Sequence, residues 1–475
     1  MNKIIKMKYI KNLSLVFLAF GFLLLSSCND FLDVNDNPTK VRDANLKVLL
    51  PNVIEKTSAA HYKAMLTANR ITHQLDHVSG YYGNKITMGG NWITSYLSAL
   101  NNLKIIVEKS EDKDHYSPHY KGIARIIQAI HIGMITDFWE NAPYSDALKG
   151  SENTTPTYDS QEKLYSTLFE YLDEAIPLLE ADESFYSPGK DDLIYSGDLS
   201  KWVKLAHSLK ARYLLHLSNK SNVDWNKIVN EAQQGLSSNA DNFQLFYNDV
   251  SLNPIYDKIA LSNQTGNLTV TFGKMYVDML NGTSYDFDPR IEKIVDKDTF
   301  PNYEGLATYD LNAPKHTCEI STKTWYAQPS APIIMMSYSE SKFIEAEALL
   351  KSGGTAYDAY EAGIIANMEM LGLSSTKIDA YISALNGSVD LEHIMKEKYI
   401  ALIFNHETWN DMRRLDFNPD IFKGFVRVTE IDGKPLERTG PAQRALYPDT
   451  EFSRNNANAK SNFKSIDEKM WKDKN

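Results

Sequence analysis

The chain has 475 residues and a formal net charge of −11 at pH 7, from 50 Lys and Arg against 61 Asp and Glu. This acidic balance argues against nucleic acid or an anionic lipid surface as the main partner. Only two cysteines occur, so the fold is expected to depend on its core rather than on disulfides, and a chain of this length can form one large domain or two fused domains.

The first 27 residues have the organisation of a secretory signal peptide. Four lysines precede an apolar run over 13–25, and no acidic residue occurs before Asp30. The run is shorter than the about 20 residues of a membrane-spanning helix and is usual for the core of a signal peptide. It ends in Leu-Ser-Ser-Cys at 25–28, which resembles the bacterial lipobox. We therefore expect cleavage before Cys28 and lipidation of its thiol.

Lipid on Cys28 is the expected membrane attachment, because no later run resembles a membrane span. Several acyl chains on one cysteine make attachment durable, at about 0.8 kcal/mol per buried methylene. Cleavage leaves 448 residues with a formal charge of −15, since it removes four lysines and no acidic residue. Residues 28–42 are polar and turn-rich, and we expect them to form a flexible tether.

Apolar residues at helical spacing dominate the sequence beyond the tether. They predict helices over 43–79, 92–109, 117–139, 160–180, 200–218, 334–351, 355–371, 390–405 and 408–415. Pro51 is expected to kink or split the first helix. Between 240 and 330 the helical period is lost except at 272–281, and Gly, Asn, Asp, Pro and Tyr are frequent. This composition predicts a loop-rich insertion.

The predicted fold class is mostly α. We expect a single domain over 43–475, with a helical scaffold over 43–239 and 331–416, the insertion at 240–330 and an irregular C-terminal tail over 417–475. Neighbouring helices joined by short loops are expected to stack as tetratricopeptide-like pairs in an α-superhelical scaffold, although no strict 34-residue consensus is present.

Conventional catalytic signatures are absent from the sequence, which contains no G-x-S-x-G, P-loop, G-x-G-x-x-G or H-E-x-x-H. His406-Glu407 begins like a zinc-protease motif but lacks the second histidine. Residues 33–44 begin like a calcium loop, but Pro38 replaces the required glycine and Ala44 the bidentate acid. We therefore predict no metal, no cofactor and no enzymatic activity.

A set of short motifs occurs in order along the chain. They are DFWENAPYSDA at 137–147, PTYDSQE at 156–162, YSGDLSKW at 195–202, LAHSLKARY at 205–213, FIEAEA at 343–348, NHETWNDMRR at 405–414 and RALYPDTE at 444–451. Behind a lipobox, this ordered set resembles the SusD/RagB family of outer-membrane nutrient-binding lipoproteins, closest to its SusD-like second branch. The corner Phe-Trp-Glu-Asn-Ala-Pro departs from the commoner Phe-Gly-Asp-Val-Pro, and His207 stands where Asn is usual.

Most of the motif residues are expected to be structural. Arg413 and Arg414 are expected to tie helix ends together through neighbouring acidic residues. Glu345 and Glu347 are expected to pair with lysine or arginine. The indoles of Trp202 and Trp409 and the rings of His131 and His207 are expected in the interior.

The resemblance implies binding without turnover. Family members capture glycans, or peptides in some cases, at the outer-membrane surface and deliver them to a SusC-like TonB-dependent transporter. The acidic stretch after Cys28 is similar to a surface-export signal of such bacteria. Two other function classes remain open: a glycosidase that uses two of the carboxylates, and a tetratricopeptide-like scaffold that binds only protein.

A glycan site needs exposed aromatic rings that stack on sugar C–H faces, with amides, carboxylates or arginine for the hydroxyls. Two regions outside the interiors of the predicted helices offer these groups. The early loop contains Tyr81, Tyr82, Asn84 and Trp92, and the insertion contains Tyr303, Tyr309 and Trp325. The alternative is that these aromatic residues pack the insertion onto the helices.

Overall fold

The computed structural model describes residues 45–77, 85–266, 270–297, 301–307, 310, 317–385, 387–431 and 434–475. Leu46–Asn475 form one compact unit. Four of the predicted ligand contacts, Tyr81, Tyr82, Asn84 and Tyr309, lie outside the described residues, as do Cys28 and the segments predicted as signal peptide and tether.

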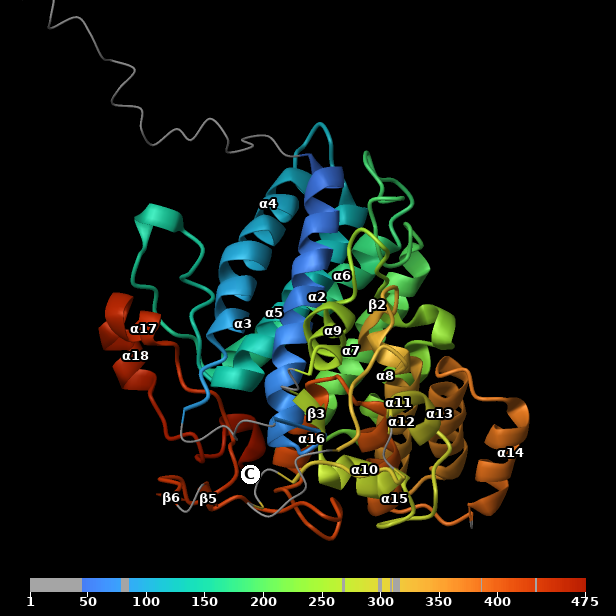
Figure 1. Cartoon of the computed structure of the whole chain (residues 1–475). Helices are drawn as coiled ribbons and strands as arrows, with labels where there is room; N and C mark the ends of the chain where they lie inside the picture. Colours follow the sequence, from blue (N-terminus) through green and yellow to red (C-terminus); the bar gives the residue numbers. More distant parts are fainter. Residues whose placement is uncertain are drawn as a thin grey trace, which may run out of the picture. The chain divides into compact units, whose positions relative to one another are not determined.

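Helices make up most of the fold (Figure 1). They are α2 (Leu46–Ile71), α3 (Gly89–Ile93), α4 (Asn101–Ser110), α5 (Pro118–Trp139), α6 (Gln161–Leu179), α7 (Leu199–His216), α8 (Trp225–Gln234), α9 (Leu261–Gln264), α10 (Lys274–Leu280), α11 (Ile291–Ile294), α12 (Tyr338–Ser352), α13 (Tyr357–Met370), α14 (Ser375–Ala384), α15 (Leu391–Ala401), α16 (Glu407–Arg414), α17 (Asp449–Arg454) and α18 (Asn456–Asn462). π-helical segments, Thr94–Leu100 and Tyr256–Ala260, lead into α4 and α9. The predicted mostly α fold class is confirmed.

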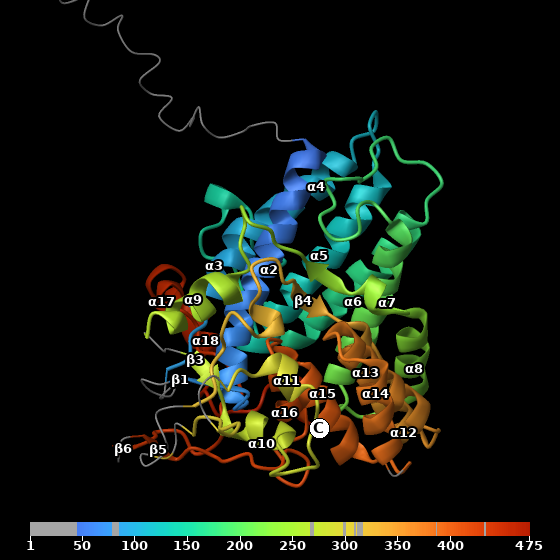
Figure 2. The same cartoon turned by 45° about the vertical axis from the view of Figure 1, so that its right-hand side comes forward.

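Helices that follow one another in the chain pack side by side. α5 contacts α4, α6 and α7, while α12 contacts α8, α13 and α15. The approach is close at two glycines of α5, since a Cβ on Gly122 would lie 2.7 Å from Cγ of Leu179 and one on Gly133 would lie 2.4 Å from the Tyr213 hydroxyl. In both views α12–α15 lie on one side of α2, and α17 and α18 on the other (Figures 1 and 2).

The helix boundaries differ from the prediction at several places. α2 is not split at Pro51. The proline removes one backbone hydrogen bond, and the buried residues on both sides of it, Leu50 and Val53, keep the helix packed. Six helices among the described residues were not predicted: α8, α9, α11 and α14, and also α17 and α18, which lie in the tail that was expected to be irregular. Ile378 is the one residue that α14 buries. A helix with so little buried surface has no apolar stripe from which it can be predicted.

Three two-stranded antiparallel sheets occur among the described residues. β2 (Phe243–Leu245) pairs with β4 (Ile333–Met336), which closes the base of the insertion. β1 (Leu75–His77) pairs with β3 (Val270–Phe272), which joins the insertion to the end of α2. β5 (Glu430–Ile431) pairs with β6 (Lys434–Pro435) in the C-terminal tail. The short sheets thus fix the insertion at two points on the helical scaffold.

Candidate functional site

The segment just before the early loop pairs with the insertion in the β1–β3 sheet. β1 ends at His77, directly before the early loop, and its Leu75 is opposite Phe272 of β3. The amide of Gly273 donates to the carbonyl of Gln74 over 2.9 Å. A Cβ at Gly273 would lie 2.2 Å from the carbonyl oxygen of His73, so only glycine permits this approach. Segments about 200 positions apart are therefore adjacent.

Further parts of the insertion are hydrogen-bonded to β3 and to Lys274, the first residue of α10. The amide of Leu306 donates to the carbonyl of Phe272 over 2.9 Å, and the amide of Lys274 donates to the carbonyl of Leu306 over 2.8 Å. A single bridge joins Thr271 to Glu319. These bonds hold residues 301–307 against the start of α10.

A cleft of about 580 Å³ lies beside α10 and the 301–307 segment. This volume is within the usual range for small-ligand sites. The lining combines one aromatic ring with amides, carboxylates and a lysine: Lys274, Asp278, Asn281, Thr283, Pro301, Asn302, Tyr303, Glu304, Gly305, Ala307 and Asp310. Amide and carboxylate groups both accept hydrogen bonds from hydroxyls, and the amides also donate. The cleft is the candidate functional site.

Tyr303 supplies the aromatic ring of the cleft and is half-buried. Its carbonyl accepts a hydrogen bond from Asn281 Nδ2 over 3.0 Å, which fixes the backbone at this position. Lys297 Nζ lies 5.3 Å from the ring centroid. Burial, assisted by Glu292, raises the pKa of the phenol. Its hydroxyl is therefore protonated at neutral pH and can both donate and accept.

The two tryptophans that were predicted as ligand contacts, Trp92 and Trp325, lie outside the lining of this cleft. Trp325 is half-buried and packs edge-on against Tyr326, with ring centroids 4.8 Å apart. Trp92 belongs to α3 rather than to a loop, and its side chain is buried at 7% exposure. Its indole contacts the rings of Tyr96 and Trp139 at 4.8 and 4.9 Å. Little of its ring face is left for a ligand.

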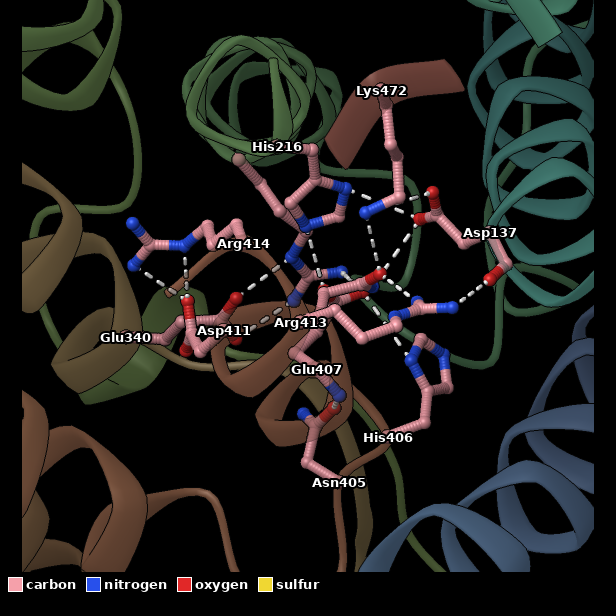
Figure 3. Close-up of polar contacts among 12 residues, drawn as sticks. Asp137, His216, Glu340, Asn405, His406, Glu407, Asp411, Arg413, Arg414 and Lys472 are labelled. Carbon is pink, nitrogen blue, oxygen red and sulfur yellow. Dashed lines mark hydrogen bonds and ion pairs between the residues drawn. The ribbon is translucent and has the colours of Figure 1, made fainter. Parts of the chain in front are cut away.

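A second set of chemically active side chains lies in the core between α5, α7 and α16 (Figure 3). His216 Nε2 is 2.8 Å from Glu407 Oε2, and its Nδ1 is 3.1 Å from Asp137 Oδ2. Burial alone would lower the pKa of His216, but the two carboxylates outweigh it and the pKa is raised. Burial would raise the pKa of Asp137, but His216 and Lys472 hold it at about 2.

These acid–histidine contacts resemble catalytic geometry but are closed to substrates. All three side chains are buried, and the cavity beside His406, which His61 and Arg212 also line, has a volume of only about 10 Å³. A space of this size is about that of a single water molecule. The network is therefore structural.

The arginines of the 405–414 motif tie segments of the scaffold together as predicted, but only Arg414 does so through acidic side chains. Arg413 Nη1 donates to the carbonyls of Asp137 and Gln443 over 2.6 and 2.9 Å. Arg414 forms buried ion pairs with Glu347 and Asp411. The prediction that Glu345 and Glu347 pair with basic residues is also confirmed, since Glu345 lies 2.7 Å from Lys342 Nζ.

The remaining interior predictions are confirmed in part. Trp202, Trp409 and His131 are fully buried. His207 is only partly buried and lies 2.7 Å from Glu231. Lys472, which the sequence did not single out, is fully buried and donates to Asn410 Oδ1 over 3.1 Å.

Comparison with known proteins identifies the family. The model of the SusD-like_2 family, described as starch-binding and associating with the outer membrane, matches residues 40–448. The chain belongs to the SusD-like family. The resemblance predicted from the ordered motifs is thereby confirmed. Among curated proteins, none matches this SusD-like chain.

Solved structures share the fold of this SusD-like protein. A SusD/RagB family protein from Bacteroides thetaiotaomicron is 22% identical with a TM-score of 0.74, covering 91% of this chain and 99% of that one. A chitin-binding SusD homolog from Flavobacterium johnsoniae is 21% identical with a TM-score of 0.74 and the same coverage. A SusD homolog from Bacteroides fragilis is 21% identical with a TM-score of 0.69, and the match covers 91% of this chain and 100% of that one.

The described residues of this SusD-like protein contain no candidate membrane-spanning helix and no candidate metal site. No helix there has the length and apolar character needed to cross a membrane. No group of three or more His, Cys, Asp or Glu side chains there is placed to hold a metal ion.

Proposed function

We propose that this SusD-like protein captures oligosaccharides at the cell surface, holds them without cleavage and delivers them to a SusC-like TonB-dependent transporter. The observation that carries the proposal is the cleft of about 580 Å³ at Tyr303, in a chain whose family is described as starch-binding. The cleft combines the groups that sugar recognition requires, an aromatic ring with amides and carboxylates around it.

The charges of the cleft favour a neutral glycan over an anionic one. Its lining contains one lysine and three acidic side chains, Asp278, Glu304 and Asp310. Lys274 Nζ is 2.6 Å from Asp278 Oδ2, so its charge is already paired. A uronic acid or sulfated sugar would meet net negative charge here, because like charges repel.

Residues of the early loop are proposed as further contacts. Tyr81, Tyr82 and Asn84 follow β1 directly in sequence, and β1 pairs with the strand that precedes α10. Tyr309 and Trp325 belong to the same insertion as Tyr303. We propose that these side chains extend the sugar-binding surface, and that the buried Trp92 supports it by packing.

We also propose a lipid anchor on Cys28 and a TonB-dependent transporter as the partner. Acyl chains on Cys28 would attach the protein to the outer membrane, exposed at the cell surface, while residues 28–42 allow it to move over its transporter. A chain tagged at its C-terminus and extracted from native outer membranes in mild detergent is expected to co-purify a TonB-dependent transporter. Recovery of other proteins in place of a transporter would favour the protein-binding scaffold instead.

Calorimetric titration of the full chain with maltoheptaose and with chitohexaose tests capture. We expect at least one to bind, and Tyr303→Ala to weaken its binding about tenfold, which corresponds to about 1.4 kcal/mol. Tyr303→Phe should retain the affinity because it keeps the ring. Tyr116→Ala removes a tyrosine that is 48% exposed and far in sequence from the cleft, and should have no effect. Unchanged affinity in Tyr303→Ala, with an unchanged circular dichroism spectrum, would contradict the assigned site.

The alternative ligand class is peptide, which the same titration addresses. Backbone amides of a peptide would be recognised by the same amide and carboxylate groups, but without the need for an aromatic ring at Tyr303. Tighter binding of mixed hexapeptides than of either glycan would favour peptide capture.

A further inference from the structure

A second cavity lies next to the candidate site, on the other side of the turn that follows α10. Its volume is about 450 Å³, and residues from this turn and from α11, α13, α14 and α15 line it. Thr283 lines the first cleft and Tyr285 the second. Because consecutive Cα atoms are 3.8 Å apart, these two wall residues have Cα atoms within about 7.6 Å of each other.

Several large aromatic side chains contribute to the walls of the second cavity. Tyr285, Phe287, Tyr360 and Tyr381 all contribute to the lining. Phe287 is 51% exposed although it is large and apolar. Exposed aromatic rings in a concave site provide the flat apolar faces on which a sugar ring stacks. The second cavity is therefore lined by four Tyr and Phe side chains, against one in the first cleft.

A buried lysine lies among these rings. Lys396 is 7% exposed, and its Nζ lies 5.3 and 5.4 Å from the ring centroids of Tyr285 and Tyr381. The ammonium group donates to the hydroxyl of Tyr381 over 2.6 Å and to Glu397 Oε1 over 2.7 Å. An ammonium group has three donors, so one is left for a hydroxyl group of a ligand in the cavity that Lys396 lines.

A rigid network holds Lys396 and Tyr381 in place. Tyr381 donates to Glu397 Oε1 over 2.8 Å. Glu397 also pairs with Arg290, which is fully buried and paired with Asp288. Two cations and two carboxylates therefore balance beneath the cavity, and its floor is electrically neutral. Such side chains are positioned before a ligand arrives, which lowers the entropy cost of binding.

The charges at the rim are also paired. Lys377 forms an ion pair with Glu292, and His393 lies 2.7 Å from Asp390. Asp286 is the remaining charged residue of the lining. A phosphate, sulfate or carboxylate ligand would find no cation that lacks a carboxylate partner, since Lys396 is already paired with Glu397. Neutral hydroxyl-rich ligands fit this combination of rings and balanced charges.

We propose that this cavity is a second saccharide-binding site, specific for neutral sugars, with Phe287 as its stacking platform and Lys396 as its fixed hydroxyl-binding group. The sugar class assigned to it rests on the proposed function. The cavity itself shares no lining residue with the first cleft, so the two sites are separable by substitution.

Titrations of the full chain with maltoheptaose, chitohexaose and the anionic hexagalacturonate test the proposal. Wild-type protein is expected to bind a neutral chain at two sites and hexagalacturonate at neither. Phe287→Ala should remove one site, weakening it at least tenfold, and Phe287→Trp should restore it because the indole keeps an aromatic face. Phe246→Ala is the matched control, since Phe246 is 62% exposed and lines neither cavity.

The outcomes separate this proposal from the proposed function. If Tyr303→Ala removes all binding and Phe287→Ala none, the second site is wrong and capture at the first cleft stands. If Phe287→Ala removes all binding and Tyr303→Ala none, the first cleft is wrong and the second site stands. Preferential binding of hexagalacturonate, lost in Phe287→Ala, would overturn the assignment of a neutral ligand. Unchanged melting temperatures confirm that the variants are folded.

Discussion

Glu140 Oε2 lies 2.6 Å from Arg444 Nη1, which joins two residues 304 positions apart. Glu140 follows α5 with φ at 69°, a conformation that favours glycine. Its carboxylate also accepts from Lys464 Nζ over 2.8 Å and from the amide of Trp471 over 2.6 Å. One strained, buried residue therefore fastens the C-terminal tail to the scaffold.

Replacing Glu140 by Gln should destabilise the fold by about 3–5 kcal/mol, because Arg444 would remain buried without its carboxylate. Urea unfolding followed by circular dichroism measures the change. Asp449→Asn is the control, since the Lys85–Asp449 pair is largely exposed and such pairs contribute about 0–1 kcal/mol. A loss below about 1 kcal/mol in Glu140→Gln would contradict the role assigned to this pair.

Stability should fall on acidification through His131. Burial lowers its pKa from 6.5 to about 3, and its ring nitrogens lie 3.1 Å from the hydroxyls of Thr57 and Ser95. Between these pH values the unfolded chain takes up a proton that the folded chain does not. The contribution of neutral His131 to the free energy of unfolding is therefore complete above pH 6.5 and is lost as the pH falls. Between pH 6.5 and 4.5 the loss from this residue is about 2–3 kcal/mol.

The pH dependence of urea unfolding tests this assignment. His131→Gln removes the titrating group. Over the same pH interval, its free energy of unfolding should fall by about 2–3 kcal/mol less than that of the wild type. The histidine assignment is wrong if the two proteins lose equal stability between pH 6.5 and 4.5.

Trp92→Ala should destabilise the protein by about 3–5 kcal/mol, as usual for a buried tryptophan. The reason is the packing of its indole against Tyr96 and Trp139. Trp325 is only half-buried, so Trp325→Ala should cost less stability. A Trp92→Ala variant with unchanged stability but weaker glycan binding would show instead that its indole contacts the ligand.

Cys28→Ala should abolish attachment to the outer membrane if the thiol carries the lipid. Fractionation of cells is expected to show loss of the variant from the outer-membrane fraction, with its uncleaved leader retained. Cys318→Ser is the control, because Cys318 is buried and burial raises the pKa of its thiol to about 11. Membrane retention of a cleaved Cys28→Ala chain would contradict lipid anchoring.

The long helices were predictable because each buries a continuous apolar stripe. α6 places Leu164, Leu168, Leu172 and Leu179 on one buried face, and this spacing is visible in the sequence. α14 buries only Ile378 and leaves no such pattern. Trp92 was assigned to a loop because of the glycines before it, whereas Gly89 and Gly90 begin α3. At α3, packing against α2 outweighs the low helix propensity of the two glycines.

The candidate site was predictable only in part. Tyr303 was predicted because aromatic residues are frequent in the insertion. Asp278 and Asn281 were missed because they lie in and directly after α10, where polar residues are ordinary. The pairing of the segment after α2 with the insertion depends on strands of three residues, β1 and β3, which are too short to show the alternation that predicts a strand. Lys472 likewise enters the core from a tail with no helical signal.

The central claim is that the protein holds a glycan without converting it. Equilibrium dialysis of the full chain against a panel of neutral oligosaccharides that includes maltoheptaose and chitohexaose, with mass spectrometry of the recovered glycans, measures both properties at once. The account predicts that at least one glycan accumulates with the protein and is recovered at its original length. Shortened products, or no accumulation of any glycan in the panel, would contradict it.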